Sequence, residues 1–118
     1  TLKGKAVYVG DWRHNDIHLT FSGTPTMTIK VQASISDTPP DFNAAQSPTN
    51  KWDYIEIVDV NTGSAIDGDT GVACSGSSDD RIFEVNVNGL TWICVNISST
   101  VTTNAGNLGV TIKSYNDA

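Results

Sequence analysis

The sequence has few charged residues for its length. Only 17% of its 118 residues are Asp, Glu, Lys or Arg, and 13 acidic residues against 7 basic ones give a formal net charge of −6. The basic residues are scattered along the chain instead of clustered. Because binding to nucleic acid depends on clustered Lys and Arg that release counterions from phosphates, we expect no nucleic-acid partner.

The chain also lacks a long apolar run. None of its hydrophobic stretches approaches the roughly 20 residues that a helix needs to cross a bilayer. Its first residues do not have the basic-then-apolar layout of a secretory signal peptide. We therefore expect no membrane partner.

Cysteine is scarce, with only Cys74 and Cys94 in the chain. Two cysteines are too few for the disulfide framework of a small secreted domain. We predict two free, buried thiols, because an unpaired cysteine packs like a small hydrophobic residue. A bridge between these two residues on neighbouring strands is the alternative.

No stretch of useful length has a helical period, and strand-like alternation takes its place. Alternation of apolar and polar residues puts one row of side chains on a core and the other toward water. About eight candidate strands follow, with turns roughly every ten residues. They are Lys5–Val9, Ile17–Phe21, Met27–Ile35, Tyr54–Val60, Gly71–Cys74, Arg81–Val87, Leu90–Ser98 and Leu108–Lys113.

This series of strands predicts an all-β fold. We expect residues 1–118 to form a single domain, an antiparallel β-sandwich that is jelly-roll-like and has about eight strands. A small closed barrel is the alternative within the same class.

Two connections are long for such a domain. Residues 37–50 contain three prolines, which cannot donate to a strand ladder, so we predict a loop with one helical turn near residues 42–46. Residues 64–80 form a second connection that is rich in Gly, Asp and Ser. Long loops within small domains often lie at contacts with other molecules.

Two groups of residues have the chemistry of metal ligands without the spacing. Asp67 and Asp69 could supply oxygen atoms to Ca²⁺, but their surroundings do not fit an EF-hand loop, and we favour a role in the turn itself. His14 and His18 lack a nearby third ligand for zinc, so we predict two solvent-facing histidines. No metal or other cofactor is expected.

The sequence does not favour an enzyme. Nucleophilic catalysis needs an activated Ser or Cys, and the Ser-Gly-Ser-Ser run at residues 75–78 lacks the strand-to-helix turn that presents such a nucleophile. A sandwich of this length with short turns leaves little room for a cleft around a substrate.

The three tryptophans differ in their expected exposure. Trp52 and Trp92 lie at or within strand patterns, so we expect both to pack in the core. Trp12 lies between Asp11 and Arg13, and we expect it to be the most exposed. It is therefore the candidate contact for a glycan.

The second half of the chain resembles small all-β virion proteins of tailed bacteriophages. The similarity rests on WDYIEIVDVNTGSAI at residues 52–66, DRIFEVNVNGLTWICVNISS at 80–99 and GVTIKSYN at 109–116. It covers a little over half of the chain, and the first half has no such counterpart. Proteins of this kind are β-sandwiches, often jelly-roll-like, that decorate or cement capsid shells or sit on tails and fibres. They have no catalytic residues.

The resemblance implies a capsid decoration or cement protein that binds and stabilises the phage head. It implies a virion location on the capsid surface, assembly in the host bacterial cytoplasm, the major capsid protein as a partner, and self-association as a homotrimer. Docking is expected through an N-terminal arm (residues 1–5) and the long loop (residues 37–50). The expected contact residues are Thr1, Leu2, Lys3, Lys5, Pro39, Pro40 and Phe42.

The resemblance leaves two other functions open. One is a tail or fibre protein, which would share the fold and bind different neighbours. The other is a carbohydrate-binding sandwich that presents Trp12 or loop residues to a host glycan.

Overall fold

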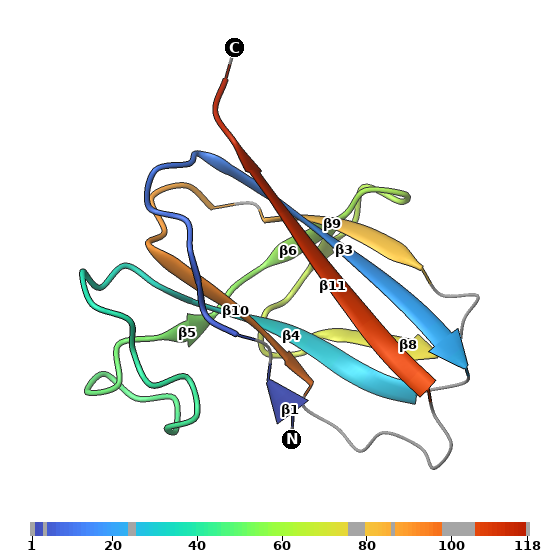
Figure 1. The fold of residues 1–118 in the computed structure, drawn as a ribbon, viewed down its shortest axis with the longest axis horizontal. Helices are drawn as coiled ribbons and strands as arrows, with labels where there is room; N and C mark the ends of the chain where they lie inside the picture. The colour runs from blue at the N-terminus through green and yellow to red at the C-terminus, as the bar shows by residue number, and fades with distance from the viewer. Residues whose placement is uncertain are drawn as a thin grey trace.

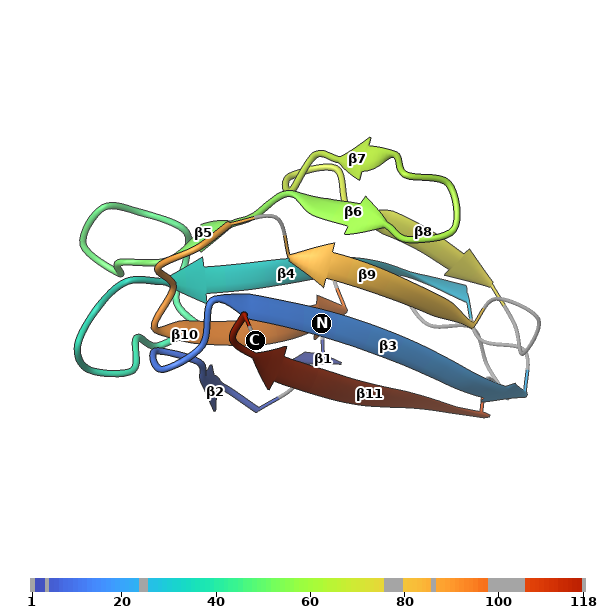
Figure 2. The same cartoon turned by 90° about the horizontal axis from the view of Figure 1, so that it is seen from above.

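The computed structural model describes residues 2–3, 5–23, 26–75, 80–85, 87–97 and 106–117. Within these residues there is no helix, and eleven strands form two antiparallel sheets (Figures 1 and 2). The predicted all-β sandwich is therefore confirmed. The alternative of a closed barrel is wrong, because the strands belong to two separate sheets.

Sheet A has two central strands with shorter strands along both edges. The central strands are β10 (Trp92–Ile97) and β4 (Thr26–Ser34). The strands β1 (Leu2–Lys3) and β2 (Val7–Tyr8) share the outer side of β10. On the other side, β8 (Val72–Ser75) and β5 (Asp53–Tyr54) share the outer side of β4.

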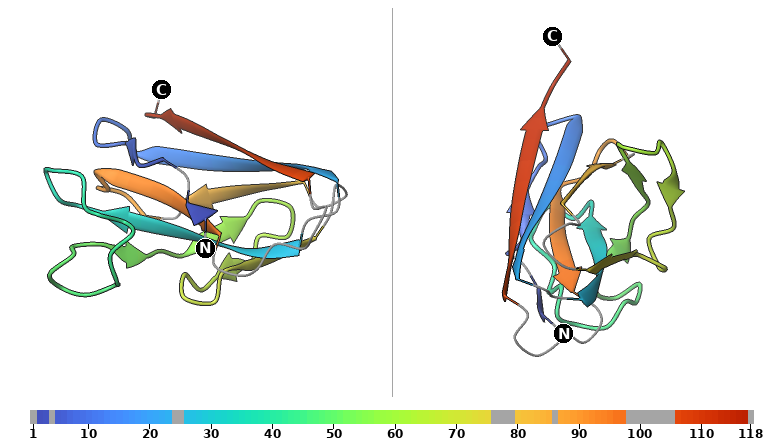
Figure 3. Two further views of the ribbon diagram at one scale, coloured as in Figure 1. Left: turned by 60° about the horizontal axis from the view of Figure 1, so that its bottom comes forward. Right: turned by 90° about the vertical axis from the view of Figure 1, so that its right-hand side faces the viewer.

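Sheet B has five strands in the order β11-β3-β9-β6-β7. The bounds are β11 (Gly106–Tyr115), β3 (His14–Gly23), β9 (Arg81–Val85), β6 (Ile57–Asp59) and β7 (Ala65–Ile66). The two long strands β11 and β3 lie side by side along one side of the molecule (Figure 3).

The strand pairs are nested in the manner of a jelly roll. The strand β2 pairs with β10, β3 with β9, β4 with β8 and β6 with β7, so each pair encloses the next along the chain. Alternate pairs lie in opposite sheets, and the pairings of β10 with β4 and β9 with β6 complete each sheet. This is the double Greek key of a jelly roll. The predicted jelly-roll-like topology is confirmed, and β11 is an extra strand added beside β3.

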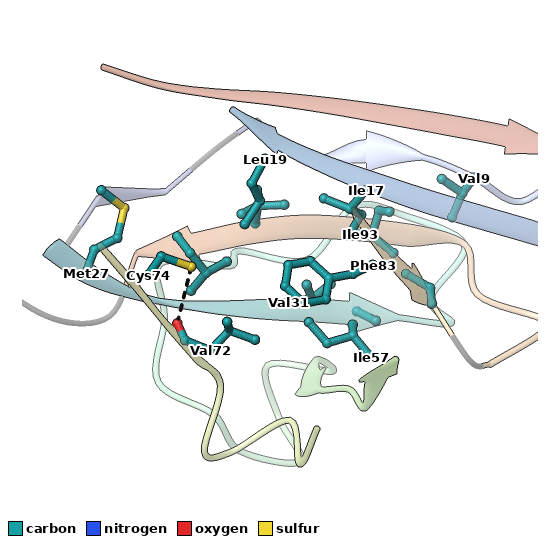
Figure 4. Close-up of a cluster of buried hydrophobic side chains, with 14 of the residues drawn as sticks. Val9, Ile17, Leu19, Met27, Val31, Ile57, Val72, Cys74, Phe83 and Ile93 are labelled. Carbon is teal, nitrogen blue, oxygen red and sulfur yellow. Dashed lines mark hydrogen bonds between the residues drawn. The ribbon is translucent and has the colours of Figure 1, made fainter. Parts of the chain in front are cut away.

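The core lies between the two sheets and contains the apolar rows of β3, β4, β9 and β10. Figure 4 shows Ile17 and Phe83 of sheet B among Val31 and Ile93 of sheet A. Burial of such rows is the main contribution to folding. The buried members are Val9, Ile17, Leu19, Phe21, Met27, Ile29, Val31, Ala33, Ile57, Val72, Cys74, Phe83, Val85, Leu90, Ile93 and Val95.

The prediction of one strand over Tyr54–Val60 is wrong. The segment contains β5, which pairs with β4 in sheet A, and β6, which pairs with β9 in sheet B. Ile55 still donates its amide to Val31 O at 3.0 Å before the chain crosses to the other sheet. Alternation continues through the crossing because both sheets bury the same row, so the pattern does not mark the change of sheet.

Other corrections concern short elements and ends. The two-residue strands β1 and β7 were not predicted, because two residues carry no detectable alternation. The predicted helical turn near residues 42–46 is wrong, because that stretch forms non-helical turns, with Ala44 N donating to Asp41 O at 3.1 Å. Asn86 lies within the predicted strand Arg81–Val87, and Ser98 ends the predicted strand Leu90–Ser98. Both residues are outside the described part of the chain.

Neither cysteine is in a disulfide bond and both are buried, as predicted. Cys74 lies in the core between the sheets, and Cys94 lies on the outer face of sheet A against Phe42 and Trp52. Because the two side chains occupy opposite faces of one sheet, a bridge between them would require rearrangement of the strands.

Replacement of Phe83 by alanine is expected to lower the free energy of unfolding by about 3–5 kcal/mol, because it leaves a cavity between the sheets. Urea denaturation followed by tryptophan fluorescence measures this change. Ile82, the preceding residue, is 46% exposed and serves as a matched control. Ile82→Ala is expected to change the free energy by about 0.5 kcal/mol or less. Equal losses in the two variants would contradict the placement of the core.

Candidate functional site

The connection from β4 to β5, residues 35–52, folds back over the outer face of sheet A. Its aromatic side chains form a second apolar cluster, separate from the core, which we call the loop cluster. The ring centroids of Phe42 and Trp52 are 6.3 Å apart, and those of Trp52 and Tyr54 are 5.1 Å apart. Trp52 Nε1 also donates to Ala44 O at 3.2 Å. The cluster contains Phe42, Trp52 and Cys94, with Ala6, Tyr54 and Trp92 packed around them.

Two side chains of β4 bind the backbone of this loop. Gln32 Nε2 donates to Phe42 O at 2.9 Å, and Ser34 Oγ donates to Lys51 O at 2.7 Å. Lys51 has a φ of 59°, in the left-handed region that side chains other than glycine rarely adopt. The hydrogen bond from Ser34 Oγ to the Lys51 carbonyl holds this strained residue in place. The loop therefore has a defined shape that the sheet beneath it imposes.

The sheet surface beneath the loop contains polar residues that are fully buried. Gln32 and Asn96 have almost no exposed surface, and Asn96 Nδ2 donates to Tyr54 Oη at 3.3 Å. Gln32 Oε1 and Asn96 Oδ1 are buried, and neither has a hydrogen-bond partner among the residues that the structure describes. A buried polar atom without a partner costs about 1–3 kcal/mol.

An open pocket of about 1010 Å³ lies between this loop and the end of the sandwich. Ala33, Trp52 and Leu90 line it and are buried, so its floor is apolar. Ile35 stands at its rim with 75% of its surface exposed. The polar lining includes Asp37, Thr38, Gln46, Ser47, Lys51 and Asp53.

The charges around the pocket are mostly negative. Asp37 and Asp53 line the pocket and are exposed, whereas Lys51 is the one basic residue in its lining. Asp53 Oδ1 accepts hydrogen bonds from Gln46 Nε2 and from the Tyr54 amide. An apolar floor with an acidic rim fits an apolar side chain that has basic neighbours.

The predicted contact residues of the loop divide into exposed and buried ones. Pro39 is exposed and Pro40 is partly buried. Both follow Thr38, a lining residue of the pocket, in the sequence. Phe42 is only 6% exposed, and its ring is the anchor of the loop cluster. Its side chain therefore holds the loop and does not face a partner.

The predicted arm is part of the edge of sheet A. Leu2 and Lys3 form β1 and pair with Ile97 and Asn96 of β10, so these residues belong to sheet A. Lys5 is exposed, and Ala6 packs against the loop cluster. Thr1 lies outside the described residues. Of the N-terminal residues, Ala6, which follows the predicted arm, is therefore the one that the structure brings against the long loop.

Trp12 is 42% exposed, as predicted, in the turn between β2 and β3. This turn lies at the same end of the sandwich as the long loop (Figures 1 and 2). The C-terminal residues hold it, because Asn116 Oδ1 accepts from Arg13 N at 2.9 Å and Asn116 Nδ2 donates to Asp11 O at 3.1 Å.

His14 is not simply solvent-facing. Its ring stacks on Tyr115 with centroids 5.0 Å apart, and its Nε2 lies 2.5 Å from Asp117 Oδ1. The hydrogen bond to His14, the charge of that ring and the nearby Arg13 lower the pKa of Asp117. The contact therefore contributes fully to the stability of the fold at pH values above the ordinary pKa of aspartate. This contribution is lost as the pH falls through the lowered pKa of Asp117. His18 is exposed, as predicted.

Asp67 serves its turn, as favoured from the sequence. Asp67 Oδ1 accepts from Asp69 N at 2.8 Å, and Asp67 O accepts from Gly71 N at 3.0 Å. Among the described residues, no group of three or more His, Cys, Asp or Glu side chains is placed to hold a metal ion.

Comparisons of the chain with known protein families, with curated proteins and with solved structures found no match. The part of the chain that the structure describes contains no helix that could span a bilayer. A proposal for the function therefore rests on the geometry above and on the resemblance in sequence.

Replacement of Phe42 by alanine is expected to release the loop, because it removes the ring that packs on Trp52 and Cys94. The free energy of unfolding should fall by about 3 kcal/mol, the lower end of the range for truncation of a buried aromatic residue. A protease of broad specificity should cleave within residues 37–50 faster than in the wild type. Thr49→Ala, an exposed change in the same loop, should leave cleavage unchanged. Equally slow cleavage of Phe42→Ala would contradict the anchoring role.

Proposed function

We propose that this protein is a structural virion subunit that decorates and cements a phage head by binding the major capsid protein. The observation that carries the proposal is the anchored loop over sheet A, with Ile35 exposed at the rim of an apolar, acidic pocket. The resemblance of residues 52–116 to small phage virion proteins points in the same direction.

The loop has the properties of a preformed docking surface. A flexible loop loses conformational entropy when it binds, whereas a loop already held by its own domain loses less. Here Gln32, Ser34 and the loop cluster hold the backbone before any partner arrives. Ile35 adds an exposed apolar side chain at the rim of the pocket, beside the apolar floor formed by Ala33, Trp52 and Leu90.

The chemistry of the pocket specifies the contact on the shell. We expect a capsid segment that inserts an apolar side chain toward Ala33 and Leu90 and places a basic residue near Asp37 or Asp53. Lys5, Pro39 and Pro40 would extend the contact along the outer face of sheet A. The net charge of −6 makes free copies of the protein repel one another, which opposes their aggregation before they bind.

Cementing follows from the area that such a contact covers. A subunit that binds two neighbouring shell proteins adds its own interface to theirs, so separating them requires breaking both. No reaction is involved, and repetition over many sites on the shell makes small contributions large.

Replacement of Ile35 by aspartate is expected to weaken binding at least about tenfold, which is ~1.4 kcal/mol, because a carboxylate would face an apolar pocket with an acidic rim. The measurement is cosedimentation of the purified protein with empty heads assembled from the major capsid protein of the phage that encodes it. Val60→Asp is the matched control, because Val60 is 55% exposed and lies beside sheet B, away from the pocket. A point substitution is preferable to removal of residues 1–5, which would also remove β1.

Two results would contradict the proposal. One is a wild-type protein that does not sediment with the heads, and the other is an Ile35→Asp variant that binds as tightly as the Val60→Asp control. If the wild type does not sediment with the heads, the exposed indole of Trp12 supports carbohydrate binding as the alternative function. Glycan-array binding by the wild type that is lost in Trp12→Ala would then assign a carbohydrate-binding function.

A further inference from the structure

The strand β11 is a long sheet edge whose outer side has no strand beside it in the described part of the chain. It pairs with β3 over all ten of its residues and forms one end of sheet B. Figure 3 shows it running along the outer side of the molecule. The other edge strands in the described residues are short: β1, β2, β5 and β7 have two residues each and β8 has four. The molecule therefore has a single extended edge among these strands.

Most of the devices that protect natural sheet edges are missing from β11. Those devices are proline, bulges, inward-pointing charges and charged side chains, especially lysine, on the edge itself. The register of β11 with β3 is continuous from Gly106 opposite Gly23 to Tyr115 opposite His14, so there is no bulge. The strand contains no proline, and its one charged residue, Lys113, lies in the outward row.

The inward row of β11 is apolar and incompletely covered. Leu108, Val110 and Ile112 lie opposite Phe21, Leu19 and Ile17, which are buried in the core. Val110 nevertheless remains 39% exposed, and its two apolar neighbours in this row are only partly buried. A strand added beside β11 would cover this row and also pair the free backbone groups of the edge.

We propose that two copies of this chain associate through β11, antiparallel to each other, about a twofold axis at Val110. In this register Val110 lies opposite the partner's Val110, and Leu108 lies opposite the partner's Ile112. The two lysines at position 113 each lie opposite an asparagine at position 107, so no like charges meet. The register follows from the strand itself, because apolar residues then face apolar residues along the inward row.

Neighbouring registers match less well. Moving the axis to Thr111 places Leu108 opposite Ser114, and moving it to Gly109 places Ile112 opposite Gly106. An axis between two residues would put inward residues opposite outward ones, which the buried face of sheet B opposes. The axis at Val110 is therefore the favoured one.

The symmetry of this contact favours a dimer over the homotrimer that the sequence resemblance implied. A twofold contact uses the same edge on both copies and covers both long edges at once. A closed ring of three copies would need a second edge complementary to β11, and the other described edges have two to four residues. This inference concerns sheet B alone and does not depend on the proposed function.

Light scattering on a sizing column tests the oligomeric state. The wild type is expected to have twice the 12.6 kDa mass of the chain. Val110→Lys and Val110→Glu are each expected to be monomeric, because each places two like charges face to face at the axis. Mixing the two variants is expected to restore a dimer, since Lys then faces Glu. This rescue is specific to a residue that pairs with itself.

The controls separate loss of pairing from loss of folding. Val110 is exposed enough for Lys or Glu to reach water in the monomer, so both variants should retain the far-UV circular dichroism of the wild type. Ile82→Lys, on the central strand β9, should remain dimeric. Val110→Cys should form a disulfide-linked dimer on mild oxidation, because opposite residues on antiparallel strands lie within disulfide range. Ile82→Cys should not.

Several results would overturn the proposal. A wild type that is monomeric at its highest soluble concentration, or trimeric, excludes the twofold pairing. A Val110→Lys variant that remains dimeric excludes β11 as the interface. Monomeric single variants whose mixture stays monomeric, together with no crosslink in Val110→Cys, exclude the axis at Val110.

Discussion

The pairing of β10 with β4 is the interaction on which the rest of the structure depends. Six consecutive residue pairs join the two strands, from Trp92 opposite Ser34 to Ile97 opposite Ile29. Their inward row, with Ile93 and Val95, fills the core, and their outward row, with Cys94 and Asn96, lies beneath the long loop. The centre of sheet A is therefore buried on both faces. One pair of strands supports both the fold and the surface that we assign to docking.

The two proposed contact surfaces lie on different sheets and can act together. The anchored loop and its pocket belong to sheet A, whereas β11 is the edge of sheet B. A dimer joined through β11 would leave both loops free, so it would present two docking surfaces to a shell. Two weak contacts held in one body bind more tightly than either alone when the geometry lets both engage. A paired subunit would thus suit a repetitive lattice.

Alternation in the sequence predicts strands well and their surroundings poorly. The segments that became β3, β4, β9, β10 and β11 were all found from their apolar rows. The segment Tyr54–Val60 was not resolved into two strands, because both sheets bury the same row and the pattern is unbroken. Gln32 and Asn96 alternate like solvent-facing residues and are buried, since a distant loop covers them. The residues next to Gln32 and Asn96 in the sequence do not indicate that a loop covers them.

Hydrogen exchange measured by NMR tests most directly whether the loop and the centre of sheet A form one unit. The probes are the backbone amides of residues 31–34 and 93–96 and the indole N–H of Trp52, which donates to the loop. We expect all of them to exchange only through global unfolding, with the free energy found by urea denaturation. An indole N–H that exchanges far faster than those amides would show that the loop opens independently, and would contradict a preformed docking surface.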